Sequence, residues 1–328
     1  VADLIGGFPE IRDVVFRPHK TLYRAVFPEH DIRVPDRDLP GYIALLKKAF
    51  PGREAAIDGI FADMRGLADE IGRLSSATAP PDMASFPTAY PHVFKNFNRT
   101  WGAMLADRVT DPKLAAVISG LWGYFGLPPS KISTFYYALP LMGYLQGGGF
   151  YPVGTSQRIS DALAGLVKKN GGEVRLNAKV ERILVRDHAA TGVRTSDGAE
   201  YRARAVVSNA NAFDTFGRMM PEEADFLKDL TARMAKSSVS FSTLLVWLGL
   251  KTDLVGKAGL KESEIFYTPT YDVEADYRAV LAGGLPDDPG YGLTVYDNLG
   301  PGFSPKGKNT VNILAMQGYD YWKPYETD

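Results

Sequence analysis

Hydrophobic and polar residues alternate with two different periods along the chain, and together the two periods predict an α/β protein. Between residues 53 and 75, apolar side chains recur every three or four positions, as one face of a helix requires. Residues 21–35 follow the period of two that is typical of strands, with Leu22, Arg24 and Val26 on one face before a Phe-Pro-Glu-His turn. The sequence therefore predicts a hairpin followed by a helical region.

Capping residues and cations mark where several helices begin and end. Asp38 and Asp111 each precede a first turn that contains proline, and both are expected to cap a helix. A further apolar stripe begins at Ile159 and stops at residues 168–171, Lys-Lys-Asn-Gly. Cations stabilise the negative end of a helix and glycine permits the left-handed turn after it, so we expect a helix to end there.

Residues 173–207 favour a run of strands. Alternation of apolar and polar residues predicts strands near residues 173–178, 183–185 and 191–195. Asp197-Gly198 is typical of a tight hairpin turn, and residues 203–207 are expected to form the returning strand. A longer strand is predicted over residues 238–250.

Charge and composition exclude several classes of function. The chain has 37 Lys and Arg against 38 Asp and Glu, which argues against a protein dedicated to binding nucleic acid. It has no cysteine, and its four histidines lack metal-binding spacing, so no metal site is expected. No apolar run is long enough to span a bilayer. We therefore expect a cytoplasmic protein, with peripheral membrane contact as an open alternative.

A glycine-rich segment, residues 147–157, carries the first candidate chemistry. It delivers a loop to the start of the helix at Ile159, where free backbone N–H groups can meet an electronegative ligand atom. The alternative is a flexible linker in which Ser156 is an ordinary helix cap. The sequence contains no Gly-x-Gly-x-x-Gly, no phosphate loop and no Gly-x-Ser-x-Gly elbow, so a free-standing dinucleotide-binding domain is not expected.

Several segments, taken in order, resemble the superfamily of FAD-dependent phytoene desaturases, carotenoid isomerases and retinol saturases. They are Trp-Gly-Tyr-Phe-Gly-Leu-Pro-Pro-Ser at 122–130, Gly-Gly-Phe-Tyr-Pro-Val-Gly at 148–154, the stretch 171–183, the pair 192–198 and 205–210, the strand at 237–249, and Ser-Pro-Lys-Gly-Lys at 304–308 with Trp322. No single segment is diagnostic, but these segments in this order are, and together they extend over nearly the whole chain.

The resemblance implies a two-domain FAD-linked oxidoreductase architecture, seen in part. Residues 1–145 would be the helical part of a substrate domain, 146–215 the central part of the FAD-binding domain, and 216–328 the sheet part of the substrate domain. The Gly-x-Gly-x-x-Gly unit and the last FAD segment of the superfamily would lie outside the chain. The expectation is therefore an interior fragment that is inactive alone.

The resemblance also implies which residues meet the ligands. FAD would be bound by six residues, Pro152, Gly154, Ser156, Val180, Asn209 and Ala210. Phe150 and Tyr151 would face the substrate, and no catalytic residue is implied. Thr155 stands where the superfamily often has a second glycine, which makes this loop less permissive.

The activity implied is flavin hydride transfer with a long apolar isoprenoid, carotenoid-like or retinoid-like polyene. Desaturation, saturation and redox-assisted isomerisation all remain open. The aromatic residues concentrated between positions 86 and 137 would suit an apolar pocket, or simply form a core. Two alternatives remain: an amine-oxidase-like flavoenzyme acting on a polar substrate, and a non-catalytic fragment that binds lipid. Expected partners are the polyene and a membrane surface, with neither nucleic acid nor metal.

Overall fold

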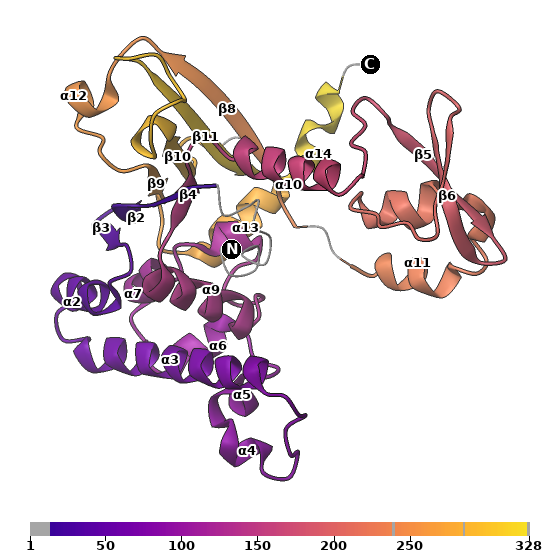
Figure 1. Cartoon of the computed structure of the whole chain (residues 1–328). Helices are drawn as coiled ribbons and strands as arrows, with labels where there is room; N and C mark the ends of the chain where they lie inside the picture. Colours follow the sequence, from indigo (N-terminus) through magenta and orange to yellow (C-terminus); the bar gives the residue numbers. More distant parts are fainter. Residues whose placement is uncertain (1–13, 238–239, 285, 327–328) are drawn as a thin grey trace. The chain divides into compact units, whose positions relative to one another are not determined.

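The computed structural model describes residues 14–237, 240–284 and 286–326, and the chain forms two compact units. One unit combines residues 1–162 with residues 240–328, and the other contains residues 163–239. The first unit is therefore discontinuous in sequence. Figure 1 colours the chain from its amino to its carboxyl end, so the two segments of the first unit are indigo to magenta and orange to yellow.

A six-stranded sheet forms the framework of the first unit, in the order β3-β2-β9-β10-β11-β8. Its strands are β2 (Thr21–Val26), β3 (Asp31–Pro35), β8 (Ser242–Leu250), β9 (Glu264–Tyr267), β10 (Tyr291–Val295) and β11 (Asn309–Gln317). The predicted hairpin is confirmed as β2 and β3. Neighbouring strands are antiparallel except β2 and β9, whose parallel pairing joins the two segments of the unit.

Helices of the amino-terminal segment gather on one side of this sheet (Figure 1). They are α2 (Leu39–Ala49), α3 (Glu54–Ser76), α4 (Phe86–Ala89), α5 (Pro91–Asn96), α6 (Trp101–Ala106), α7 (Pro112–Ile118), α8 (Trp122–Phe125) and α9 (Thr134–Gly147). The later segment adds α12 (Leu254–Ala258), α13 (Val273–Ala282), α14 (Tyr319–Trp322) and short 3₁₀ turns at Tyr296–Asn298 (η4) and Lys323–Tyr325 (η5).

The core of the first unit forms where the predicted apolar stripe of α3 meets its neighbours. Ile57, Phe61 and Met64 on that stripe are fully buried, together with Tyr137 and Leu141 of α9. Burying side chains of this size stabilises a fold by about 1.5–3 kcal/mol each. The core therefore anchors α9, which leads directly into the glycine-rich segment.

Both predicted helix caps are confirmed. The Asp38 carboxylate accepts a hydrogen bond from the Gly41 N–H at the start of α2. The Asp111 carboxylate accepts from the N–H groups of Lys113 and Leu114 at the start of α7. Each cap satisfies backbone donors that the helix itself leaves free.

The glycine-rich segment begins with a short strand. Strand β4 (Phe150–Pro152) pairs antiparallel with β1 (Phe16–Pro18) in a separate two-stranded sheet. Helix α10 (Gln157–Lys169) follows, as predicted from its apolar stripe, and the division between the two units falls within it.

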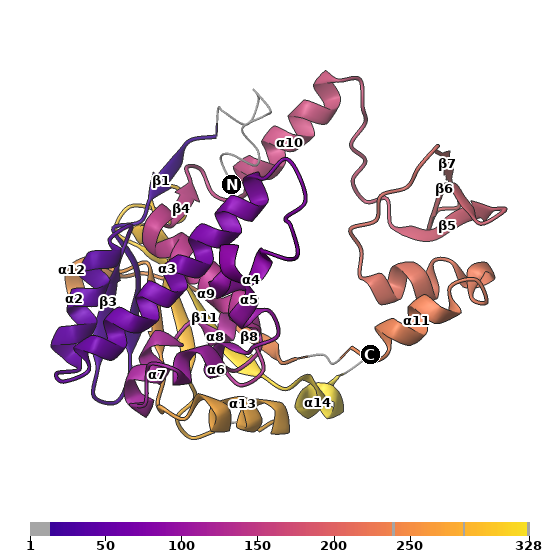
Figure 2. The ribbon, with the colours of Figure 1, turned by 90° about the horizontal axis from the view of Figure 1, so that it is seen from below.

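The second unit contains a three-stranded antiparallel sheet (Figure 2). Its strands are β5 (Val180–Arg186), β6 (Ala189–Thr195) and β7 (Glu200–Arg202), and Asp197-Gly198 forms the predicted turn between β6 and β7. A π-helical turn at Asp214–Arg218 (η2), a 3₁₀ turn at Pro221–Glu223 (η3) and α11 (Lys228–Met234) complete the unit.

Two strand predictions in this region are wrong. Residues 173–178 and 203–207 are not strands, and within them Leu176 is 81% and Val207 is 96% exposed. Alternation shows which side chains could share a buried face, but a strand also needs a neighbour to pair with. The strand predicted over 238–250 forms from Ser242 onward, and residues 238–239 lie outside the described residues.

The predicted functional division into segments 1–145, 146–215 and 216–328 remains a prediction. The two compact units are defined by contacts within the chain, whereas the predicted division is defined by whether a segment binds FAD or the substrate. In the part of the chain that the structure describes, no helix has the length and apolar character to cross a membrane.

Candidate functional site

A cavity of about 560 Å³ lies between the large sheet and the turn that leads into α8. Strands β8, β9, β10 and β11 provide its floor, and residues 120–124 provide the facing wall. Its volume is in the range of small-molecule sites, which is about 300–1,000 Å³. All of its lining residues belong to the first unit.

Strand register arranges the floor of this cavity in rows. Residues opposite one another in neighbouring strands point to the same face of a sheet. One row is Glu264, Thr294, Asn312 and Trp247, and the next is Phe266, Gly292, Leu314 and Leu245. The first row is polar at three of its four positions, whereas the second is entirely apolar.

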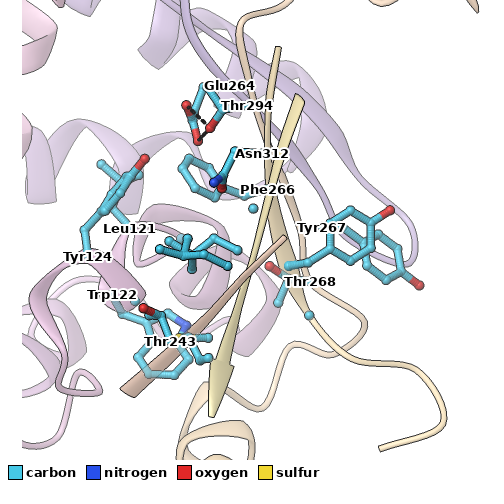
Figure 3. A pocket seen from close by; sticks show the side chains of 18 of the residues that line it. Leu121, Trp122, Tyr124, Thr243, Glu264, Phe266, Tyr267, Thr268, Thr294 and Asn312 are labelled. Atoms are coloured by element: carbon cyan, nitrogen blue, oxygen red, sulfur yellow. Dashed lines mark hydrogen bonds between the residues drawn. The ribbon is translucent and has the colours of Figure 1, made fainter. Parts of the chain in front are cut away.

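Aromatic side chains of α8 form the facing wall. Trp122 is buried and makes edge contacts with Phe241 and Tyr277, at centroid distances of 5.9 and 6.1 Å. The Tyr124 ring meets the edge of Phe266 at 5.3 Å, which joins this wall to the floor. In Figure 3, Trp122 lies at the end of the pocket away from Glu264 and Thr294.

Glu264 is the acidic group in the polar row. The Thr294 hydroxyl lies 3.1 Å from its Oε1 and 3.0 Å from its Oε2, as the dashed lines in Figure 3 show. Burial raises the pKa of Glu264 to about 7, although hydrogen bonds with Thr294 and Tyr124 act in the opposite direction. At neutral pH, the Glu264 carboxyl group is therefore protonated, and so uncharged, in a large fraction of the molecules.

A series of aromatic contacts connects the glycine-rich loop to the same pocket. Tyr151 contacts Phe303 at a centroid distance of 5.7 Å, Phe303 contacts Tyr296 at 5.2 Å, and Tyr296 stacks on Trp247 at 5.4 Å. Flat aromatic faces next to a glycine-containing backbone fit a planar ring with polar edges, as a flavin has. The residues present are thus compatible with the flavin that the resemblance implies.

The five predicted site residues of the first unit all lie in the glycine-rich segment, three of them in β4. Tyr151 lines the main pocket, and Phe150 lines a neighbouring cavity of about 440 Å³ that also reaches Glu264 and Tyr124. The other three, Pro152, Gly154 and Ser156, follow in the chain, Pro152 buried and the other two exposed. Their roles toward FAD and substrate remain predictions.

The loop is strained at one non-glycine position. Gly154 has a φ of +82°, which glycine adopts readily, but Thr155 has a φ of +74°. A β-branched residue rarely adopts this left-handed conformation. This is the position at which the sequence departs from the expected second glycine.

The remaining three predicted residues lie in the second unit. Val180 begins β5 opposite Thr195. Asn209 and Ala210 are exposed in the segment after β7, where the Ala210 N–H donates to the Ser208 hydroxyl at 3.3 Å. That these residues meet the adenine end of FAD remains a prediction.

Sequence reasoning missed Glu264, Thr294 and Asn312. The stretch that contains Thr294, residues 283–310, is rich in Gly, Pro and Asp, a composition that is typical of loops between short strands. The period of two in Glu264-Ile265-Phe266 places Glu264 on one face with Phe266, but only the register of four strands shows what shares that face. Among the described residues, no cluster of His, Asp or Glu could hold a metal ion.

Comparison with known families gives a match over most of the chain. The profile of the family described as "Flavin containing amine oxidoreductase" matches residues 11–313. This match confirms the expectation of a flavin-dependent oxidoreductase family.

Similar proteins of known name fall within the superfamily that the sequence resembles. An all-trans-retinol 13,14-reductase of Danio rerio is 26% identical over an alignment of 312 residues that covers 88% of this chain and 50% of that protein. A neurosporene-forming phytoene desaturase of Rhodobacter capsulatus is 29% identical over 228 residues, covering 66% and 43%. A chloroplastic prolycopene isomerase of Arabidopsis thaliana is 25% identical over 302 residues, covering 88% and 47%. The chain thus spans about half the length of the curated relatives it matches.

Solved structures show the same fold. An oxidoreductase from Methanosarcina mazei superimposes with a TM-score of 0.61 at 14% identity, over 98% of this chain and 66% of that one. A variant of putrescine oxidase superimposes with a TM-score of 0.52 at 13% identity, over 96% and 61%. The predicted α/β architecture of FAD-linked oxidoreductases is confirmed, and by its sequence the chain belongs to the family of flavin containing amine oxidoreductases.

Proposed function

We propose that the protein is an FAD-dependent oxidoreductase that acts on a long apolar polyene, and that the pocket beside α8 is part of its substrate site. The observation that carries this proposal is the lining of the pocket. Trp122 of the wall and Phe266 and Leu314 of the floor are typical of this lining, and no lysine or arginine is among the described residues that line it. Such walls favour an uncharged, apolar ligand.

The names of the three relatives support the same class of substrate. They refer to retinol, phytoene and prolycopene. An amine substrate, the alternative from sequence, would be a cation at neutral pH and would need a fixed negative charge. The carboxyl groups that line the pocket are those of Glu264 and Asp276. Burial raises the pKa of both, that of Glu264 to about 7, and so opposes a fixed negative charge.

FAD, when bound, supplies hydride acceptance or donation. In the first unit, Pro152, Gly154 and Ser156 would contact it. For the second unit, taken by itself, contact of Val180, Asn209 and Ala210 with FAD is a separate proposal. The other residues orient the substrate: the row through Phe266 supports an apolar chain, and Trp122 closes its far end against water. Desaturation, saturation and isomerisation all fit this arrangement.

A visible absorption spectrum of the protein encoded by the complete reading frame tests the cofactor. We expect the bands of bound flavin. On anaerobic mixing with a polyene, these bands should disappear if the oxidised flavin accepts a hydride, or reappear if the reduced flavin donates one. A folded protein that shows no flavin, even after FAD is added, would overturn the proposal in favour of a lipid-binding protein without redox chemistry. Reduction of the flavin by diamines but not by polyenes would favour the amine alternative.

Substitution Gly292→Val tests the pocket. Carbon added at Gly292 would lie 3.5 Å from the Phe266 ring and 4.0 Å from Leu314, so a small side chain fits but occupies pocket volume. We expect polyene affinity to fall by about tenfold or more, because lost contact area in a small site costs over 1 kcal/mol. The flavin spectrum should be unchanged. Gly249→Val in β8, where nothing lies within 4 Å, is the control and should leave affinity unchanged.

A further inference from the structure

We propose that Glu264 and Thr294 form a head-group subsite, which accepts a neutral hydroxyl or carbonyl oxygen at one end of an otherwise apolar ligand and rejects a carboxylate as pH rises. The inference rests on the proposed function, because it takes the pocket as the substrate site. It narrows the substrate class from any apolar polyene to one that carries a neutral oxygen at one end.

The first step of the argument is the position of polar groups within the pocket. Glu264, Thr294 and Asn312 lie side by side in one row of the floor, and the neighbouring row through Phe266 is apolar. Figure 3 shows this polar group at one end of the pocket and Trp122 toward the other. A ligand that lies along the floor therefore meets hydrogen-bonding groups at one end only.

The second step is the hydrogen-bonding capacity of the carboxyl group. When protonated, Glu264 can donate one hydrogen bond to a ligand oxygen and accept others, and when ionised it only accepts. A hydroxyl group satisfies either state because it both donates and accepts. A carbonyl oxygen suits the protonated state.

The third step is the charge around Glu264. The ionisable groups that line the pocket with it are His19 before β2, Tyr124 of α8, Tyr151 of β4, Asp276 of α13, Tyr267 of β9, Tyr291 of β10 and Tyr296 of η4. Burial lowers the pKa of His19 and raises that of Asp276, so it disfavours the charged form of each group. The pocket thus offers no fixed cation, among its described lining, to balance a ligand carboxylate.

These steps predict how ligands with different head groups are discriminated. A carboxylate ligand beside an ionised Glu264 places two like charges together without a counter-ion, which is strongly unfavourable. It binds well only while Glu264 keeps its proton, so its affinity falls by up to about tenfold for each pH unit above the midpoint of that titration. An alcohol lacks this dependence, because it can donate to an ionised Glu264, and an uncharged ester loses one hydrogen bond but meets no charge repulsion.

Fluorescent polyenes with 18 carbons provide a direct binding test on the protein encoded by the complete reading frame. The probes are parinaryl alcohol, methyl parinarate and parinaric acid, which share one conjugated chain and differ in the head group. Trp122 and Trp247 line the pocket, so energy transfer from tryptophan to the bound tetraene reports binding. Dissociation constants are measured from about pH 6 to about pH 8.5, where an alkyl carboxylic acid in water is ionised throughout.

We expect the ratio of acid to alcohol dissociation constants to rise about tenfold or more over this range, with a midpoint near 7. Glu264→Gln should make the ratio independent of pH. Thr294→Val should move the midpoint upward, because the Thr294 hydrogen bond lowers the pKa of Glu264. Asp58→Asn, which removes one exposed carboxylate on α3 away from the lining, should behave as the unmodified protein.

A flat ratio in the unmodified protein, or a pH-dependent ratio that survives Glu264→Gln, would overturn the inference. If Glu264→Gln does not fold, the direction of the midpoint in Thr294→Val decides, and an unmoved or lowered midpoint counts against the subsite. Failure of the proposed function looks different, because it removes the flavin spectrum, which this binding measurement does not use.

Discussion

At the scale of single residues, the pocket keeps Glu264 in surroundings that oppose its ionisation. The pKa rises from an ordinary value of 4.5 to about 7 in the folded protein, so between these values the folded state binds more protons than the unfolded state. Glu264 therefore does not lower the free energy of unfolding below pH 4.5. As pH rises from 4.5 toward 7 the free energy of unfolding decreases, and above pH 7 it stays at the lower value.

Glu264→Gln should abolish this decrease in the free energy of unfolding, because glutamine does not ionise. Relative to the unmodified protein, we expect the variant to gain about 2 kcal/mol in free energy of unfolding between pH 5 and pH 8, because each pKa unit corresponds to about 1.4 kcal/mol. Urea unfolding at the two pH values measures the gain. Asp58→Asn is the matched control for charge, and an equal response of the two variants would show that Glu264 is not the responsible group.

Thr155 offers a second test at this scale. Its φ of +74° costs a β-branched residue about 1–2 kcal/mol, and glycine relieves that cost while adding some entropy to the unfolded chain. Thr155→Gly is therefore expected to stabilise the protein by about 0.5–1 kcal/mol. Val153→Gly, at a position without positive φ, should destabilise it, and thermal unfolding of both variants makes the comparison.

The residues that sequence alone could identify are those whose role is local. Asp38 and Asp111 cap helices through N–H groups two or three positions away, and Thr155 differs from the residue that its own loop favours. Glu264 depends on Thr294, thirty positions later, and on Tyr124 from a distant helix. Such a site follows from strand register, which the pattern along one strand does not contain.

At the scale of elements, the small sheet of the second unit depends on one close approach. A Cβ atom added at Gly192 in β6 would lie 2.2 Å from the Tyr201 carbonyl oxygen and 3.0 Å from the Arg202 Cα, both backbone atoms of β7. Backbone atoms cannot move aside as the end of a flexible side chain can. The pairing of β6 with β7 therefore requires glycine here.

Gly192→Ala should separate β7 from β6. We expect a loss of at least about 2 kcal/mol in the stability of the second unit, in the range of backbone-strain substitutions. Hydrogen exchange should accelerate over residues 189–202 and remain unchanged in α3 and α9. Gly249→Ala in β8, which has open space around it, serves as the matched strand glycine, and similar exchange in both variants would contradict the prediction.

Element predictions succeeded where the pattern was long or flanked by clear stop signals. The apolar stripe of α3 recurs over about five turns, and the stop after α10 combines two lysines with glycine, so both helices form as expected. Residues 173–178 alternate regularly and residues 203–207 are mostly apolar, but neither stretch is a strand in the structure. Strand pairing depends on two segments, and the pattern of apolar and polar residues along one segment does not show whether a second strand lies beside it.

At the scale of the whole molecule, order of segments was more informative than any single motif. The resemblance placed the chain in an FAD-linked architecture, which the family match and the fold of the solved structures confirm. The floor of the pocket was not foreseen, since its strands come from positions 242–317 and meet helices encoded before position 150. That meeting is a consequence of topology and not of composition.

The parallel pairing of β2 with β9 has a consequence for synthesis of the protein. Ala25 of β2 pairs with Phe266 of β9, which is synthesised roughly 240 residues later. At usual elongation rates this takes on the order of 10–50 s, and β2 has no partner on that edge until then. Throughout that interval the inner edge of the first hairpin is open to the wrong neighbour. Slower translation of the intervening segment would lengthen this exposure, so we expect yield of the folded protein to depend on chaperones that shield early strands.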